Sequence, residues 1–158
     1  MRPVYIIDSK SDLEKILNNY NSKDIYYVDN SYIFRFPISH LSLYNLTRFK
    51  GKKFKRRFLE VCNRINVFKT DEVLVRYKRG IRFLGNYKWF FSAIIGIVES
   101  KKVVVYHELS KSEIPYRVFR LNLLIDYAEE NDNILIIPIE KGSDISEIKN
   151  YKRYIVNE

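Results

Sequence analysis

The chain has 158 residues and a formal net charge of +9. Apolar residues make up 46% and aromatic residues 15%, which excludes a disordered chain and allows a real apolar core. The charge is informative about partners, and it favours a nucleic acid. A membrane is not expected as a partner, because the longest apolar run, Trp89 to Val98, is too short to span a bilayer.

Cys62 is the only cysteine, so neither a disulfide nor a cysteine-based zinc site can form within the chain. It lies on the apolar face of a predicted helix, where a buried structural thiol is expected. No signal peptide is recognised at the start of the sequence. These features together predict an intracellular, cytoplasmic protein.

The first 51 residues predict a small N-terminal α/β domain. Its helix follows the capping-box pattern Ser11–Glu14, and Ser42 predicts the N-cap of a second, short helix that ends at Gly51. Three strands are predicted here, at residues 4–7, 25–28 and 32–36.

Residues 52–158 predict a C-terminal domain that begins with an amphipathic helix over 53–66 and has a second helix over 113–130. Strands are predicted at 73–78, 81–87, 89–98, 102–107, 134–139 and 151–156. The first two form a basic hairpin around Gly80. This order indicates an α+β architecture with a mixed sheet rather than a doubly wound sheet.

Positive charge is concentrated between Asn30 and Leu59, a stretch without any acid. Cations gather at the start of the predicted 53–66 helix, where each opposes the helix dipole at a cost of about 0.3–1 kcal/mol. Such placement indicates an external phosphate partner, although a solvated charged face is the simpler alternative. The candidate RNA-binding residues are Lys52, Lys53, Lys55, Arg56, Arg57, Arg76, Lys78, Arg79 and Arg82.

The sequence offers little sign of a catalytic centre. His40 and His107 stand in no metal-ligand spacing, and no glycine-rich phosphate loop occurs. No cofactor and no metal are therefore predicted. The remaining enzymatic alternative is a metal-dependent nuclease that uses Asp71, Glu72 or Glu99.

Two segments, Tyr77–Phe83 and Gly142–Ile145, resemble motifs of the archaeal tRNA-splicing endonucleases (tRNA-intron endonucleases). The first is similar to the hairpin Gly-x-Lys-x-Gly-x-Asp-Phe-x-x-Tyr of that family. The order of predicted elements in both halves is also similar. The resemblance implies a tRNA-intron-endonuclease-like C-terminal domain. It also implies metal-free RNA cleavage by a Tyr, a His and a Lys.

The chain departs from the family at each catalytic position. The motif Tyr is Asn86, and Tyr87 is one residue away, which would place it on the other face of a strand. Residues 99–102 contain no His, and acids stand where the Lys is expected at the end of the second helix. The motif Asp is Arg82. The resemblance therefore implies that this chain has no catalytic residues of its own.

What the resemblance implies is a non-catalytic structural subunit of a heterotetrameric splicing endonuclease. Its partners would be a catalytic paralogue, two copies of each chain, and precursor tRNA with a bulge-helix-bulge. The alternative is a stand-alone RNA- or DNA-binding protein. The subunit-interface candidates that the resemblance implies are Glu108, Glu113, Tyr151, Tyr154 and Val156.

Overall fold

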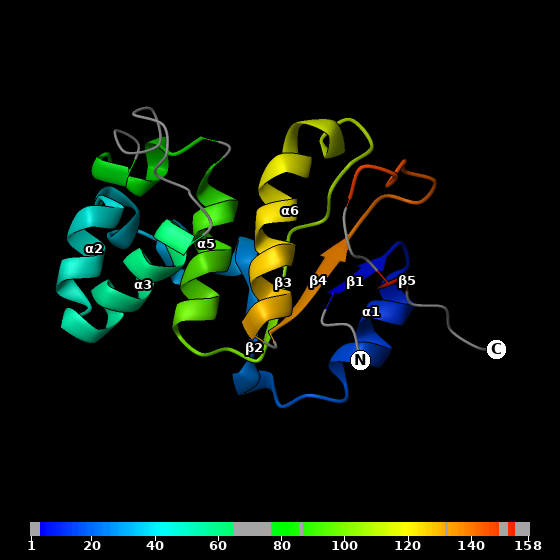
Figure 1. Ribbon diagram of the computed structural model, residues 1–158, viewed down its shortest axis with the longest axis horizontal. Helices are drawn as coiled ribbons and strands as arrows, with labels where there is room; N and C mark the ends of the chain where they lie inside the picture. Colours follow the sequence, from blue (N-terminus) through cyan, green and yellow to red (C-terminus); the bar gives the residue numbers. More distant parts are fainter. Residues whose placement is uncertain (1–3, 65–76, 86, 132, 149–151, 154–158) are drawn as a thin grey trace.

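A parallel five-stranded sheet forms the centre of the computed structural model, with the strands in the order β2-β3-β4-β1-β5 (Figure 1). The structure describes residues 4–64, 77–85, 87–131, 133–148 and 152–153. The strands are β1 (Val4–Ile7), β2 (Ile25–Tyr27), β3 (Val103–Val105), β4 (Ile134–Pro138) and β5 (Lys152–Arg153).

Helices cover both faces of the sheet, but unequally. They are α1 (Lys10–Leu17), α2 (Leu43–Phe49), α3 (Lys52–Arg64), α5 (Tyr87–Val98) and α6 (Ile114–Asn131). Helix α1 packs on one face, where Ile16 joins Tyr5 and Val103 in a small core. Helices α5 and α6 pack on the other face, and α3 packs on α5. Crossover connections between parallel strands share one handedness, so connections that run in opposite directions across the sheet place their helices on opposite faces. The connection from β1 to β2 contains α1 and runs opposite to the connections from β2 to β3 and from β3 to β4.

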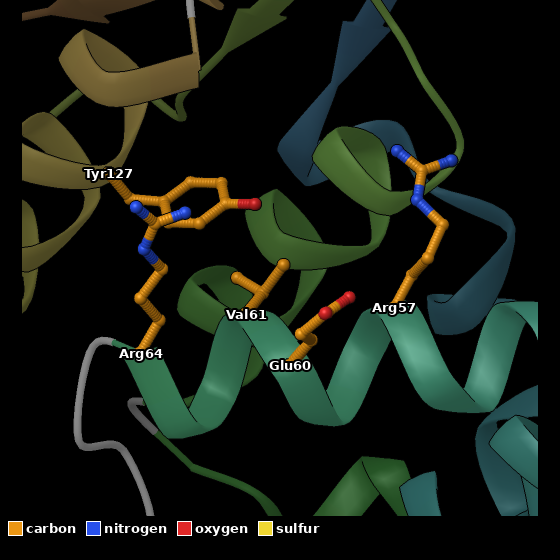
Figure 2. A pocket seen from close by; sticks show the side chains of 5 residues that line it. All are labelled: Arg57, Glu60, Val61, Arg64 and Tyr127. Carbon is orange, nitrogen blue, oxygen red and sulfur yellow. The ribbon is translucent and has the colours of Figure 1, made fainter.

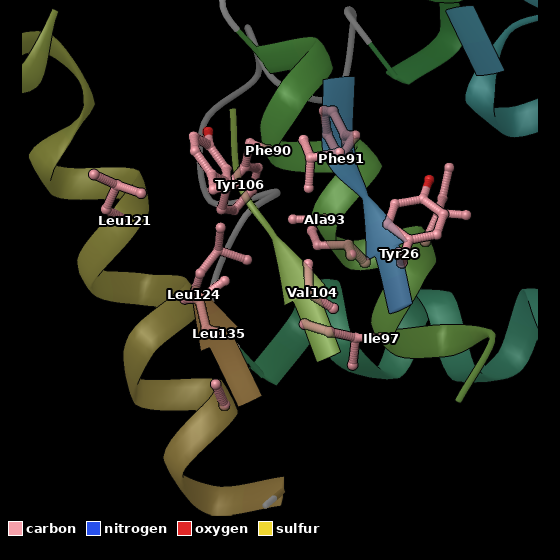
Figure 3. Packing of buried hydrophobic residues seen from close by; sticks show 14 of the residues in the cluster. Tyr26, Phe90, Phe91, Ala93, Ile97, Val104, Tyr106, Leu121, Leu124 and Leu135 are labelled. Atoms are coloured by element: carbon pink, nitrogen blue, oxygen red, sulfur yellow. The ribbon is translucent and has the colours of Figure 1, made fainter. Parts of the chain in front are cut away.

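Helix α5 is the centre of the larger core. All its residues from Phe90 to Val98 are buried. Figure 3 shows Ala93 and Ile97 of α5 facing Tyr26 of β2 and Val104 of β3. The Tyr26 hydroxyl shares hydrogen bonds with Ser31 and Ser92 inside this core. A helix that is apolar on every side needs apolar neighbours all around it, and this core provides them.

Several predicted elements are confirmed with small shifts of their ends. Ser42 caps α2, where its Oγ accepts a hydrogen bond from the Asn45 amide at 3.0 Å. Gly51 ends the helix with a φ of +100°. Cys62 is fully buried, as predicted. The Ser11–Glu14 capping box is not formed, since α1 begins at Lys10 with Ser9 at the N-cap position.

The fold prediction is confirmed only in its coarse form, a combination of helices and strands. The predicted strand 89–98 is wrong, because these residues form most of α5. The predicted strand 32–36 is wrong as well, because 3-10 turns occupy Tyr32–Phe34. The predicted mixed sheet is absent from the described strands, whose pairs are all parallel.

The basic hairpin around Gly80 is also wrong in the part that the structure describes. Residues Ile81–Phe83 form a 3-10 turn, and α5 begins at Tyr87. Gly80 instead forms an antiparallel bridge with Ser42, and the Ile81 amide donates to the Leu41 carbonyl at 2.8 Å. This segment therefore packs beside α2 and does not join the sheet.

Strands from both sides of the predicted boundary between residues 51 and 52 belong to one sheet, since β1 and β2 come before the boundary and the other strands come after it. A single apolar cluster also contains Val28 and Leu46 from the first part together with Phe58 and Phe91 from the second. Among the described residues, no helix is long and apolar enough to cross a bilayer.

Candidate nucleic-acid interface

The basic side of α3 faces outward because its apolar side is fixed against α5. Phe58 is fully buried and stacks on Phe91 with ring centroids 6.2 Å apart. Residues three or four positions apart share a helix face, so the cations between the buried positions are left on the solvent side. Lys52, Lys53 and Arg56 are accordingly exposed.

The electrostatic setting of these cations is unfavourable within the chain. The first turn of α3 contains cations and no acid, although a helix N-terminus carries partial positive charge. Within the described ranges, no carboxylate lies within ion-pair distance of Lys52, Lys53 or Arg56. Arg57 differs, since its Nη1 donates to Ser100 Oγ at 2.8 Å. Lys52, Lys53 and Arg56 are therefore available to an external anion, and Arg57 keeps further N–H donors beside the one that Ser100 accepts.

Aromatic side chains accompany this charge. Phe49, the last residue of α2, is 82% exposed. Tyr44 lies between two cations, with its ring centroid 5.8 Å from Arg48 Cζ and 5.6 Å from Lys55 Nζ. Cations interleaved with accessible rings suit a backbone of phosphates with unpaired bases.

A second basic segment joins the first through Tyr77. The Tyr77 ring stacks on Phe58 of α3 at 6.1 Å, and its hydroxyl shares a 3.0 Å hydrogen bond with Thr47 of α2. Burial raises the pKa of Tyr77, so its hydroxyl stays protonated and structural. The exposed cations next to it are Lys78, Arg79 and Arg82. Arg76 lies outside the described residues.

We use the name basic surface for the α3 cations together with the adjoining segment, namely Lys52, Lys53, Lys55, Arg56, Arg57, Lys78, Arg79 and Arg82. The structure thus brings together two groups of candidates that are far apart in the sequence.

A groove of about 530 Å³ runs along α3 on the side toward α6 (Figure 2). Its α3 wall is formed by Arg57, Glu60, Val61 and Arg64, and Tyr127 of α6 faces them. In Figure 2 the Arg64 side chain lies beside the Tyr127 ring, and the Glu60 carboxylate stands between the two arginines. No sequence pattern indicates Tyr127, because only the packing of α6 beside α5 brings it here.

The carboxyl end of β3 carries a cluster that sequence reasoning missed. His107 is only 8% exposed and stacks on Trp89, and both of its ring nitrogens lack a hydrogen-bond partner among the described residues. Its Nε2 lies 3.8 Å from Glu113 Oε1. The buried guanidinium of Arg117 lies over Trp89, 4.7 Å from the ring centroid. A motif search fails here because three separate segments build the cluster.

Burial lowers the pKa of His107, and the Arg117 charge lowers it further, while Glu113 and Asp29 oppose this effect. The hydrogen bond from the Ser110 amide, 2.9 Å from Glu113 Oε2, lowers the pKa of Glu113. The cluster therefore contains a neutral histidine beside a carboxylate.

The other predicted site residues are dispersed. Glu99 accepts a hydrogen bond from Tyr32 at 2.8 Å and pairs with Lys50 at 3.2 Å, so a structural network occupies it. Tyr87 begins α5 beneath the guanidinium of Arg120. Glu108 is exposed after β3. Six predicted or motif positions lie outside the described residues: Asp71, Glu72, Asn86, Tyr151, Tyr154 and Val156.

Comparison of the chain with protein-family models, with curated proteins and with solved structures finds no match. The resemblance to tRNA-splicing endonucleases, and the structural-subunit role that it implies, therefore stay predictions. The basic surface, the groove and the His107 cluster are the features from which a function can be argued.

Proposed function

We propose that the chain binds RNA through the basic surface. The observation that carries this proposal is the set of exposed, unneutralised cations at the start of α3: Lys52, Lys53 and Arg56. Lys52 and Lys53 stand in the first turn, where the helix dipole opposes them, and Arg56 follows in the second turn without a carboxylate partner among the described residues. A phosphate backbone compensates them and gains counterion release.

Unpaired RNA fits this surface better than duplex DNA does. Phe49 and Tyr44 offer exposed or half-exposed rings beside cations, and proteins recognise single-stranded bases by stacking them on aromatic side chains. A duplex keeps its bases stacked on one another and leaves such rings unused.

Binding of precursor tRNA as a non-catalytic subunit is the narrower form of the same proposal. It needs the basic surface for the RNA and a catalytic paralogue for cleavage. Cleavage of a bulge-helix-bulge RNA by a mixture of the two chains, but by neither of them alone, would support it. Cleavage by this chain alone would refute the non-catalytic role.

The general proposal is tested by fluorescence anisotropy with a labelled single-stranded RNA, a bulge-helix-bulge RNA and a duplex DNA over a range of salt concentrations. The variant Lys52→Ala/Lys53→Ala/Arg56→Ala should weaken RNA binding. It should also reduce the slope of log K against log salt by up to about 2, since each lost phosphate contact removes about 0.7.

The matched control removes three exposed lysines elsewhere, in Lys10→Ala/Lys15→Ala/Lys141→Ala. It lowers the net charge equally, so it reports what net charge alone contributes. Equal losses in the two triple variants would contradict the assignment of the binding surface. Tighter binding of the duplex DNA than of either RNA would contradict the choice of RNA.

A further inference from the structure

Glu60 is an anomaly in the groove along α3. It is the only acid among the 13 residues of that helix, and it lines the groove together with Arg57 and Arg64. Those arginines stand three and four positions away, at the spacing that favours helix ion pairs. Nevertheless, no hydrogen bond or ion pair joins Glu60 to another described residue. A carboxylate at this place repels phosphate, so Glu60 needs a role other than phosphate binding.

The groove is large enough for a nucleotide, and its lining offers charged groups, one aromatic ring and one apolar side chain. Its volume of about 530 Å³ lies in the usual range of about 300–1,000 Å³ for ligand pockets. The buried side chain of Val61 provides an apolar contact, and the Tyr127 ring stands on the opposite wall. Arg57 and Arg64 are two helical turns apart, about 10.5 Å along the axis at 1.5 Å per residue.

An ionised carboxylate only accepts hydrogen bonds, and it has two oxygens to do so. Guanine is the RNA base that presents two neighbouring donors, N1–H and the N2 amino group, on its Watson–Crick edge. Adenine and cytosine present one amino donor beside an acceptor, and uracil one imino donor between two carbonyls. A lone carboxylate among cations therefore favours guanine and penalises the other bases.

We infer that the groove binds an unpaired guanosine of the RNA. Glu60 accepts hydrogen bonds from guanine N1–H and N2–H, the Tyr127 ring packs against the base, and Arg57 and Arg64 contact the flanking phosphates. This inference rests on the proposed RNA-binding function and adds base specificity to it.

The test uses labelled oligouridine decamers that carry one guanosine, one inosine or one adenosine at the centre. The guanosine decamer should bind at least about fivefold more tightly than the adenosine decamer, since a bidentate contact discriminates at that level or above. Inosine keeps N1–H but lacks the N2 amino group, so its decamer should be intermediate.

The decisive variant is Glu60→Gln, with Glu14→Gln of α1 as the matched exposed control. Glutamine loses the negative charge and one acceptor. It should weaken binding of the guanosine decamer and strengthen binding of the adenosine decamer, a change of opposite sign. The Glu14→Gln variant should leave the ratio between the two decamers unchanged.

Two other outcomes separate the two proposals. If Glu60→Gln strengthens binding of all three decamers alike, Glu60 is merely a repulsive charge. The guanosine inference is then overturned, while RNA binding stands. If none of the decamers binds in a salt-dependent way, the proposed function itself fails, and the inference fails with it.

Discussion

His107 and Trp89 lie nearly face to face, with their ring centroids 4.5 Å apart and their planes inclined by 23°. The contact leaves the two imidazole nitrogens buried and without hydrogen-bond partners in the described part of the chain. A buried polar group without a partner costs about 1–3 kcal/mol. Protonation adds a buried positive charge to this cost, so the protonated imidazole opposes folding more than the neutral one does.

Stability should depend on pH through this histidine. Because burial lowers the folded-state pKa of His107 below its ordinary value of 6.5, the unfolded chain binds the proton first as the pH falls. The free energy of unfolding should therefore decrease as the pH falls through about 6.5, until the folded-state pKa is reached. Urea denaturation between about pH 8 and about pH 5 measures this decrease.

The variant His107→Phe keeps an aromatic ring against Trp89 and removes the titration. It should be as stable as the native chain at pH 8, or more stable, and it should lose the decrease near pH 6.5. The exposed His40, changed to Gln, provides the control. A decrease of the same size in His107→Phe would show that other groups cause it.

Gly96 and Tyr26 form a close contact that should make an alanine at position 96 destabilising. Replacement of a helical glycine by alanine usually stabilises by about 0.5–1 kcal/mol. A Cβ at Gly96 would lie 2.6 Å from Tyr26 Cδ1, and hydrogen bonds to Ser31 and Ser92 hold that ring. Gly96→Ala should therefore destabilise by about 1–3 kcal/mol, as overpacked cores do.

Urea denaturation measures this cost, and a second background identifies its origin. In a Tyr26→Leu background the same glycine change should cost less, because the ring that it meets is gone. Equal costs in the two backgrounds would mean that the contact with Tyr26 is not the cause.

The elements that sequence reasoning recovered have local signals. Ser42 and Gly51 mark the two ends of α2, and the spacing of Phe58, Val61 and Cys62 identifies the buried side of α3. The basic residues of α3 were found in the same way, because an amphipathic period assigns them to the solvent side.

The missed elements lack such signals. Helix α5 is apolar on all sides, so a helical period cannot be seen in it, and its isoleucines favour a strand. The predicted strand 89–98, one member of the predicted mixed sheet, comes from this apolar run. Tyr127 and His107 belong to sites that only tertiary packing assembles, so one-dimensional spacing cannot identify them.

Cys62 should be chemically silent in the folded chain. It is fully buried, and burial raises the pKa of its thiol far above the ordinary value, so almost no thiolate is present. Reaction with a disulfide reagent such as DTNB should be slow in buffer and rapid in urea. The variant Cys62→Ala/Asn63→Cys moves the thiol to an exposed neighbour and should react rapidly in both. Equal rates for the two chains in buffer would show that Cys62 is accessible.

Phe49 should contribute to RNA binding and not to folding. Its side chain is 82% exposed at the end of α2, next to Lys50 and the first cations of α3. Phe49→Ala should change the free energy of unfolding by less than about 0.5 kcal/mol, as most surface changes do. It should weaken binding of single-stranded RNA by about 1–3 kcal/mol, the value of one stacked base.

Thermal denaturation and anisotropy measure these two quantities on the same protein. Phe119 of α6, 74% exposed, provides the matched control, and Phe119→Ala should affect neither. Unchanged RNA affinity in Phe49→Ala would contradict the prediction and would mean that the cations bind RNA without this ring. An equal loss in both variants would indicate that exposed rings act through nonspecific adhesion. Only a loss confined to Phe49 shows that an unpaired base stacks beside the cations of α3.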